Sequence, residues 1–230
     1  MLALALAAWI AAAPGPEVVD GRRLLLDCEK SFLKIETMRG TTKTRSTAYP
    51  AGQTDPVVED AVSDFWYRRF DSIRYENTRP LPHTVISDGK TLWIWSPSED
   101  AIVEEPLESA TLAARTLLSV HPGFGIDHLA PIPLDDFRAA VKPKEGTADV
   151  VVTLTPLANE TLRATLEIVV DPDRRFVRQI RTLVKEGGTV ISDVRFTDEV
   201  EAKPGIWFAR RVTTKELLPD GSTVEQVKAY

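Results

Sequence analysis

Few residues in this chain combine the types and the spacing that catalysis or metal binding requires. The histidines are His83, His121 and His128, and the last two flank a short segment that also holds Asp127. Two imidazoles and one carboxylate at that spacing match no common metal motif, so we expect no bound metal. Cys28 is the only cysteine in the sequence, which excludes an intrachain disulfide and a cysteine-based metal site. We expect it to be a buried helical residue.

Two pairs of neighbouring carboxylates, Glu104-Glu105 and Asp135-Asp136, are the remaining candidates for acid–base chemistry. Successive side chains of a strand point to opposite faces, so neither pair would act together on one substrate. The sequence also lacks a Gly-x-Ser-x-Gly elbow, a His-Glu-x-x-His motif, a glycine-rich phosphate loop and a dinucleotide fingerprint. We therefore expect no enzyme activity and no cofactor, because neither a nucleophile nor its base can be nominated.

Large apolar side chains, in contrast, recur at strand spacing. Trp93 and Trp95 share one face of a predicted strand, and Leu92 and Ile94 share the other. A strand that is apolar on both faces must be covered on both, by helices, by a second sheet or by a ligand. An ordinary sandwich core and a ligand cavity both agree with this pattern. The preceding segment adds more aromatic and apolar bulk at Phe65, Tyr67, Ile73 and Tyr75.

Short strands separated by turns are the elements that must position these residues. Asp88-Gly89, between the apolar segments 84–86 and 91–95, predicts a two-residue hairpin. Alternation of apolar and polar residues predicts further strands within 162–170 and 190–196. Such tight hairpins predict an antiparallel sheet, because a parallel one would need a helix at every crossover. Other turn signals lie at Asp171–Asp173, Gly187-Gly188 and Asp220-Gly221.

Two helices are expected beside this sheet. The first covers residues 17–30, and its apolar stripe consists of Val18, Gly21, Leu25, Cys28 and Phe32. The second covers residues 107–120 and ends at the Pro122-Gly123 pair. Its apolar face includes Leu107, Leu117 and Leu118.

Composition limits the partners and the compartment. A net charge of −6 argues against a nucleic acid partner, since phosphate binding needs a clustered basic surface. Residues 1–13 carry no charge and are almost wholly Leu and Ala, which suits the apolar core of an export signal. We expect residues 1–16 to be a signal peptide and residues 17–230 to form one domain. A short buried helix at the N-terminus is the alternative.

Residues 69–75 read Arg-Phe-Asp-Ser-Ile-Arg-Tyr, and residues 85–97 read Val-Ile-Ser-Asp-Gly-Lys-Thr-Leu-Trp-Ile-Trp-Ser-Pro. The first segment resembles the Arg-Pro-x-x-Phe-x-Trp element of the outer-membrane lipoprotein carrier family, LolA, with Phe70 in place of the proline. The second resembles that family's Val-Ser-Asp-Gly-Lys-Thr-Leu-Trp-x-Tyr-x-Pro hairpin at most positions. A looser likeness continues in order through residues 152–196, whereas 204–230 is longer and more polar than the family pattern.

The resemblance implies a mainly β fold with some helix: a single curved antiparallel sheet, or incomplete β-barrel, with helices covering its concave face. It implies a monomeric periplasmic carrier that binds acyl chains of lipoproteins, or a related lipid, in an apolar cavity and delivers them towards the outer membrane. An inner-membrane release complex and an outer-membrane acceptor are the implied partners. Candidate cavity residues are Phe65, Tyr67, Ile73, Tyr75, Trp93, Trp95, Leu107, Leu117 and Leu118.

Arg69 matches the arginine of the family's Arg-Pro element. In such carriers this arginine bonds to the lid region and keeps the empty cavity closed, so the resemblance implies a lid-locking role, with the lid at residues 107–120. A solvent-facing strand residue is the alternative for Arg69. The alternative function is a regulatory lipid or lipoprotein sensor on the same fold that binds a membrane-anchored partner. Such sensors usually carry a further C-terminal domain, for which we expect this chain to be too short.

Overall fold

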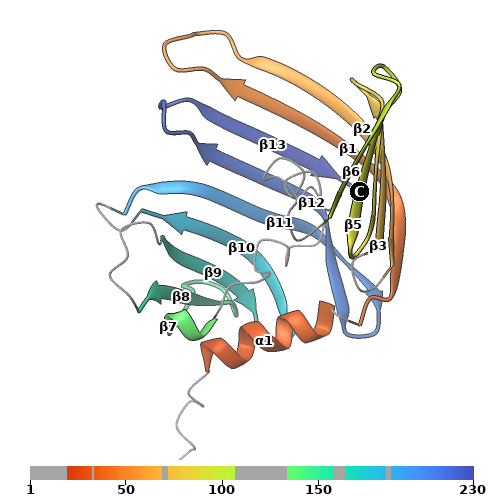
Figure 1. Ribbon diagram of the computed structural model, residues 1–230. Helices are drawn as coiled ribbons and strands as arrows, with labels where there is room; N and C mark the ends of the chain where they lie inside the picture. Colours follow the sequence, from red (N-terminus) through yellow and green to blue (C-terminus); the bar gives the residue numbers. More distant parts are fainter. Residues whose placement is uncertain (1–19, 33, 69–71, 107–133, 158–163, 185–187) are drawn as a thin grey trace, which may run out of the picture.

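The computed structural model describes residues 20–32, 34–68, 72–106, 134–157, 164–184 and 188–230 (Figure 1). Several predictions lie outside these residues: the signal peptide at 1–16, Arg69, and the second helix with Leu107, Leu117 and Leu118. Within the described residues, no helix has both the length and the apolar character needed to cross a bilayer.

The described strands form one antiparallel sheet of thirteen strands, in the order β6-β5-β4-β3-β2-β1-β13-β12-β11-β10-β9-β8-β7. Among the described residues, β6 and β7 are the two edges and do not pair with each other, so the sheet is open. The strands are β1 Thr37–Tyr49, β2 Val57–Arg68, β3 Ser72–Arg79, β4 His83–Asp88, β5 Thr91–Ser96, β6 Ala101–Pro106, β7 Phe137–Pro143, β8 Val150–Pro156, β9 Thr165–Asp171, β10 Phe176–Leu183, β11 Val190–Lys203, β12 Ile206–Leu217 and β13 Thr223–Ala229.

Turn chemistry fixes the hairpins where the sequence predicts them. Gly89 joins β4 to β5 with φ at +87°, a conformation that glycine adopts without steric cost. The Asp88 carboxylate accepts hydrogen bonds from the backbone N–H groups of Lys90 and Thr91, both at 2.8 Å. Asp171 caps the turn between β9 and β10 in the same way. The predicted hairpins and the antiparallel sheet are therefore confirmed.

The main hydrophobic core lies between the strands from β7 to β12 and the single described helix, α1 Gly21–Phe32. The predicted alternation supplies it, since Ile168 and Val170 of β9 and Val194 and Phe196 of β11 are all buried. Helix α1 adds Leu24, Leu25 and Cys28 to the same cluster. The buried positions predicted at Gly21, Leu25 and Cys28 are thus confirmed.

Helix α1 begins at Gly21, later than the predicted residue 17, because Asp20 caps it. The Asp20 carboxylate accepts hydrogen bonds from the backbone N–H groups of Arg22 at 3.0 Å and Arg23 at 3.4 Å. An Asp in this position satisfies donors that the first helical turn leaves without a partner.

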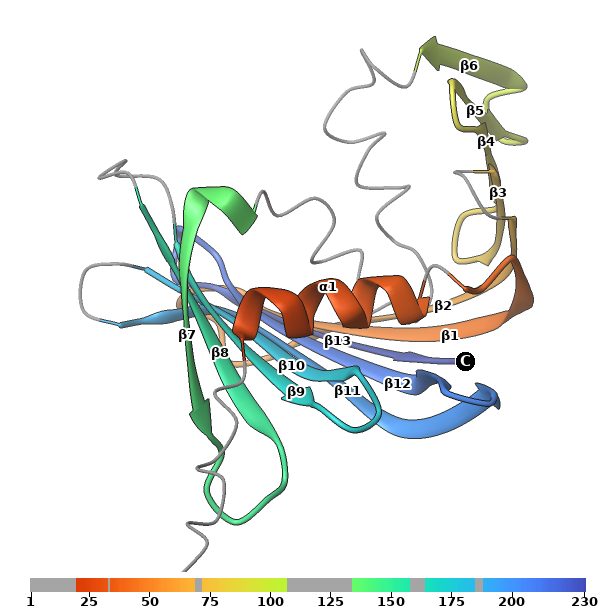
Figure 2. The same ribbon diagram turned by 90° about the horizontal axis from the view of Figure 1, so that it is seen from below.

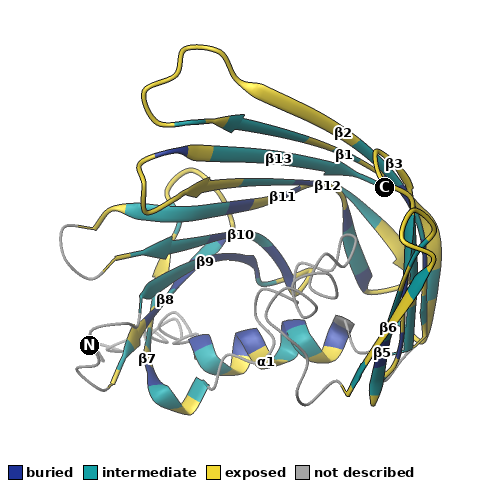
Figure 3. Cartoon of the chain, turned by 45° about the horizontal axis from the view of Figure 1, so that its top comes forward, coloured by how far each residue is buried: buried dark blue, intermediate teal, exposed yellow. Residues whose placement is uncertain are grey.

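The sheet bends into a U, and α1 lies inside it against β7 and β12 (Figure 2). Buried residues are concentrated in α1 and in β8 to β12, whereas exposed residues are frequent in the long hairpin of β1 and β2 (Figure 3). The predicted curved antiparallel sheet is confirmed. Of the predicted helical cover, the described residues include α1 alone.

A buried charge network ties the strands of this core half together. Arg178 of β10 donates hydrogen bonds to Asp149 at 3.0 Å, to Asp171 at 2.7 Å and to Glu199 of β11. Burial alone would lower the pKa of Arg178, but Glu199 and the other two carboxylates raise it above its ordinary value. The guanidinium therefore stays charged and joins the start of β8, the end of β9 and β11 through one residue.

We predict that Gly21→Ala destabilises the protein, because the added Cβ would lie 2.7 Å from Val141 Cγ2 and 2.9 Å from Val152 Cγ1. Overpacking of this kind costs about 1–3 kcal/mol. Chemical denaturation measures the free energy of unfolding, and Arg23→Ala on the exposed side of α1 is the control, expected within about 0.5 kcal/mol of wild type. Equal stabilities for both variants would show that α1 is not seated on the sheet as described.

Candidate functional site

The sheet has a gap between β1 and β12, at the end that β13 does not reach. β13 is shorter than both of its neighbours: it pairs with β1 only from Lys43 to Tyr49, and with β12 only from Arg211 to Leu217. Residues 37–42 of β1 and 206–210 of β12 therefore have no described strand between them. The two strands separate at this end of the sheet.

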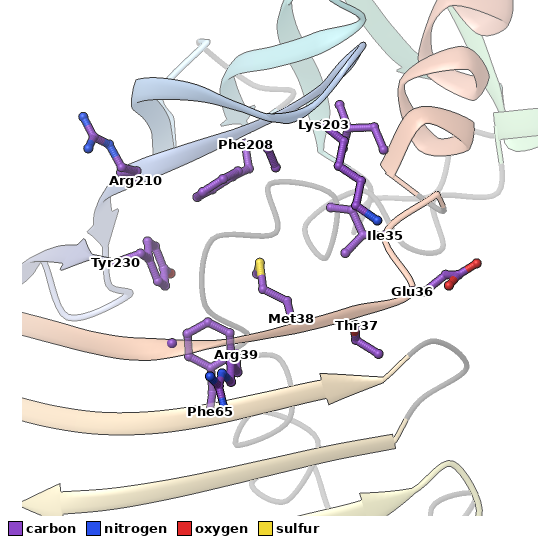
Figure 4. A pocket seen from close by; sticks show the side chains of 13 residues that line it. Ile35, Glu36, Thr37, Met38, Arg39, Phe65, Lys203, Phe208, Arg210 and Tyr230 are labelled. Atoms are coloured by element: carbon purple, nitrogen blue, oxygen red, sulfur yellow. The ribbon is translucent and has the colours of Figure 1, made fainter.

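A pocket of about 310 Å³ occupies this gap. Its lining is mostly apolar and comes from segments far apart in the sequence: the start of β1, the middle of β2, the turn between β11 and β12, and the last residue of the chain. Met38, Phe208, Tyr230 and Phe65 surround its centre (Figure 4). Ile35 and Ile206 complete the apolar wall.

Strand register explains why these side chains meet. Gly40 of β1 pairs with Phe65 of β2, and Met38 pairs with Tyr67, so all four lie on one face. Phe65 is 4% exposed and packs edge-on against Tyr230, with ring centroids 6.4 Å apart. A Cβ at Gly40 would come within 2.9 Å of the Phe65 ring. The glycine thus allows the aromatic ring to lie directly against β1.

The same face continues from the pocket across β3, β4 and β5. Phe65 pairs with Tyr75, which pairs with Val85, and Tyr67 pairs with Ile73. Val85 and Leu92 of the next two strands are buried there, with Tyr75 and Ile94 packed against them. Four residues predicted to line a cavity are therefore brought onto one face: Phe65, Tyr67, Ile73 and Tyr75.

Trp93 and Trp95, predicted to line the same cavity, lie on the opposite face. Trp93 pairs with Ile86, which pairs with Arg74, which in turn pairs with Trp66. Trp95 is 44% exposed. Alternation along β5 separates the two tryptophans from Leu92 and Ile94, as the sequence predicts. The pairing with neighbouring strands, which the sequence of β5 alone does not reveal, decides which face each side chain shares. It places both tryptophans on the face of Trp66, away from Phe65 and Tyr75.

Charged residues also line the pocket. Arg39, Lys203, Arg210 and Glu36 are among its lining residues, although Arg39 pairs with Trp66 and its side chain therefore lies on the opposite face. None of the three cations forms an ion pair within the described part of the chain, whereas Arg45, Arg174 and Arg178 do.

The described residues that could take part in acid–base or nucleophilic chemistry lie apart from one another. Burial, with a smaller contribution from Asp27, raises the pKa of the Cys28 thiol to about 12, so the sulfur stays protonated. Glu104 pairs with Trp93 and Glu105 with Leu92, which places the two carboxylates on opposite faces, as predicted. Asp135 and Asp136 instead lie in a short 3₁₀ turn, η1 Leu134–Asp136.

The described residues do not support a metal site either. They contain no group of three or more His, Cys, Asp or Glu side chains placed to hold a metal ion. His121 and His128 lie outside these residues.

Sequence reasoning missed most of the pocket. Met38 stands in a strand rich in threonine, and Phe208 and Tyr230 follow it by most of the length of the chain. Only the pairing of β13 with β1 on one side and with β12 on the other brings them together. The run Gly205-Ile206-Trp207-Phe208 was the one local signal, since it places large apolar residues directly after a turn.

Comparison with known proteins shows a similarity to one family over part of the chain. The model of the LolA family, "Outer membrane lipoprotein carrier protein LolA", matches residues 52–121, which include the hairpin of β4 and β5. An outer-membrane lipoprotein carrier protein of Alkalilimnicola ehrlichii is 24% identical over 140 residues, which cover 58% of this chain and 61% of that protein. The corresponding protein of Bordetella avium is 28% identical over 166 residues, covering 70% of this chain and 76% of that protein. The chain therefore matches less than two thirds of the first relative.

Solved structures support the fold. A LolA superfamily protein from Nitrosomonas europaea aligns over 92% of both chains with a TM-score of 0.54 and 10% identity. A DUF1329 family protein from Desulfovibrio piger aligns over 91% of this chain and 90% of its own, with a TM-score of 0.54 and 12% identity. At such identities the likeness concerns the fold alone. The resemblance to the LolA family, predicted from the hairpin, is confirmed, and this family consists of carriers rather than enzymes.

Proposed function

We propose that this protein is a periplasmic carrier of lipoprotein acyl chains or a related lipid, in keeping with the match of residues 52–121 to the LolA family model. It would accept them from an inner-membrane release complex and deliver them to an outer-membrane acceptor. The observation that carries the proposal is the apolar pocket between β1 and β12, continuous with the face that holds Phe65 and Tyr75.

Energetics favour such a surface as the shelter for an acyl chain. Covering hydrocarbon is worth about 0.8 kcal/mol per CH₂, so each chain of a lipid anchor has a large free-energy cost in water. The pocket volume of about 310 Å³ stands near the lower end of the range for ligand sites. It therefore suits part of a lipid anchor. The remaining chains would lie along the inner face of β2 to β5, beside Tyr67 and Ile73.

Release without a fuel molecule requires that the empty state be stabilised as well. We propose that Arg69 does this through hydrogen bonds to the segment 107–120, including Leu107, Leu117 and Leu118, which would act as a lid. Such bonds contribute about 1 kcal/mol each, so a few of them oppose filling without preventing it.

Binding of a fluorescent triacylated lipopeptide to the purified protein tests the proposal. Met38→Gln puts an amide into the apolar pocket, and we expect the affinity to fall about tenfold, because a polar group without a partner there costs about 1–3 kcal/mol. Trp95→Gln on the opposite face is the matched control and should bind like wild type. Wild-type protein that does not take up the lipopeptide, or equal loss in both variants, would rule out this site.

The lid proposal has a separate test in the rate of handover. Arg69→Leu should slow transfer of the bound lipopeptide to acceptor vesicles at least severalfold, because the empty state loses its stabilising bonds. Arg68→Leu, one residue earlier and exposed, should transfer at the wild-type rate. If Arg69→Leu released its cargo as fast as wild type, the lid-locking role would be wrong.

A further inference from the structure

The pocket between β1 and β12 combines an apolar wall with cationic groups that have no ion-pair partner among the described residues. Arg39 pairs with Trp66, so its side chain lies on the face opposite to Phe65, and Figure 4 shows the Arg210 side chain pointing away from the centre of the pocket. Glu36 is directed away from the centre of the pocket (Figure 4). Lys203 is therefore the cationic side chain whose charged end lies at the apolar space, although the whole chain has a net charge of −6.

Lys203 is placed at the pocket by an irregularity of the sheet. The pairing of β11 with β12 shifts register between Glu201 and Lys203, so that Lys203 pairs with Ile206 of the pocket wall. Such bulges commonly re-aim a side chain next to a site. The amine of Lys203 lies beside Ile35 at the edge of the apolar space (Figure 4).

The nearest acidic residue along this strand is already occupied. The Glu201 carboxylate accepts a hydrogen bond at 2.7 Å from the backbone N–H of Gly205, in the turn that joins β11 to β12. Gly205 has φ at +73°, which favours glycine in this tight turn. Glu201 thus closes the turn, and Lys203 forms no ion pair with Glu201 or with any other of the described residues.

From this geometry we infer that the pocket takes a single-chain anionic amphiphile, with its hydrocarbon tail among Met38, Phe208 and Tyr230 and its anionic head on Lys203. The volume of about 310 Å³ suits one chain. Carboxylate and phosphate are the two heads that a lysine ammonium group would recognise, as in a fatty acid or a lysophospholipid. This inference rests on the proposed lipid-binding function and names the preferred ligand class.

Displacement of a neutral fluorescent lipid probe tests the inference with three competitors that share one acyl chain. These are palmitate, palmitoyl lysophosphatidic acid and the neutral 1-palmitoylglycerol, each used below its micelle concentration. We expect at least one of the two anions to displace the probe at about fivefold lower concentration than the neutral lipid, which is the upper range for one exposed ion pair. Preference for one anion alone identifies its head as the carboxylate or the phosphate.

Variants test whether Lys203 is responsible for the preference for anionic lipids. Lys203→Gln should remove it and leave binding of 1-palmitoylglycerol unchanged, whereas Lys203→Arg should keep it. Lys142→Gln, an exposed lysine of β7, is the control and should behave like wild type. Equal displacement by all three lipids, failure of all three, or a preference that survives Lys203→Gln would overturn the inference. Lipopeptide binding by wild type and Lys203→Gln in the same series shows whether the proposed carrier function itself still holds.

Discussion

Between β1 and β12 the sheet is closed only as far as β13 reaches, and this limit determines the shape of the site. Backbone hydrogen bonds hold the three strands together from Lys43 to Tyr49 of β1. Beyond that stretch, β1 and β12 separate. The apolar side chains at their ends line a pocket there, because no described strand lies between them. The side chains of β1 and β12 do not fill this space, because β13, which separates the two strands elsewhere, is too short to reach it. An apolar surface left open in this way is typical of a binding site.

The two halves of the sheet differ in how many buried residues their inner faces carry. From β7 to β12, α1 covers the strands, and the network around Arg178 fixes their ends, so this half has a conventional core. From β2 to β5, the buried cluster of the described residues is small and centres on Val85 and Leu92. The first half is therefore packed against a helix, while the second has fewer buried residues on its inner face among those described. The pocket lies at the junction of the two, where Tyr230 contacts Phe65.

Local sequence signals predict the elements well, since turn chemistry and alternation act over a few residues. Asp88-Gly89 and Asp171 specify their hairpins, and the buried side of α1 follows from the spacing of Gly21, Leu25 and Cys28. The inner face of β5 could not be predicted in this way, because alternation defines two faces without saying which one is concave. Trp93 and Trp95 consequently lie on the face opposite to Phe65 and Tyr75, a separation that the sequence does not predict. Met38, Phe208 and Tyr230 were missed for a related reason, since their proximity results from the long-range pairing that inserts β13 between β1 and β12.

Light-induced cross-linking of a lipopeptide with a diazirine in its acyl chain would test the central claim most directly, because mass spectrometry of the adducts locates the chain. The account predicts adducts on β1, β2 and β12, at or beside Met38, Phe65 and Phe208, and their loss when unlabelled lipopeptide is added in excess. Adducts confined to the opposite face around Trp66 and Trp95, or none that depend on light, would contradict it.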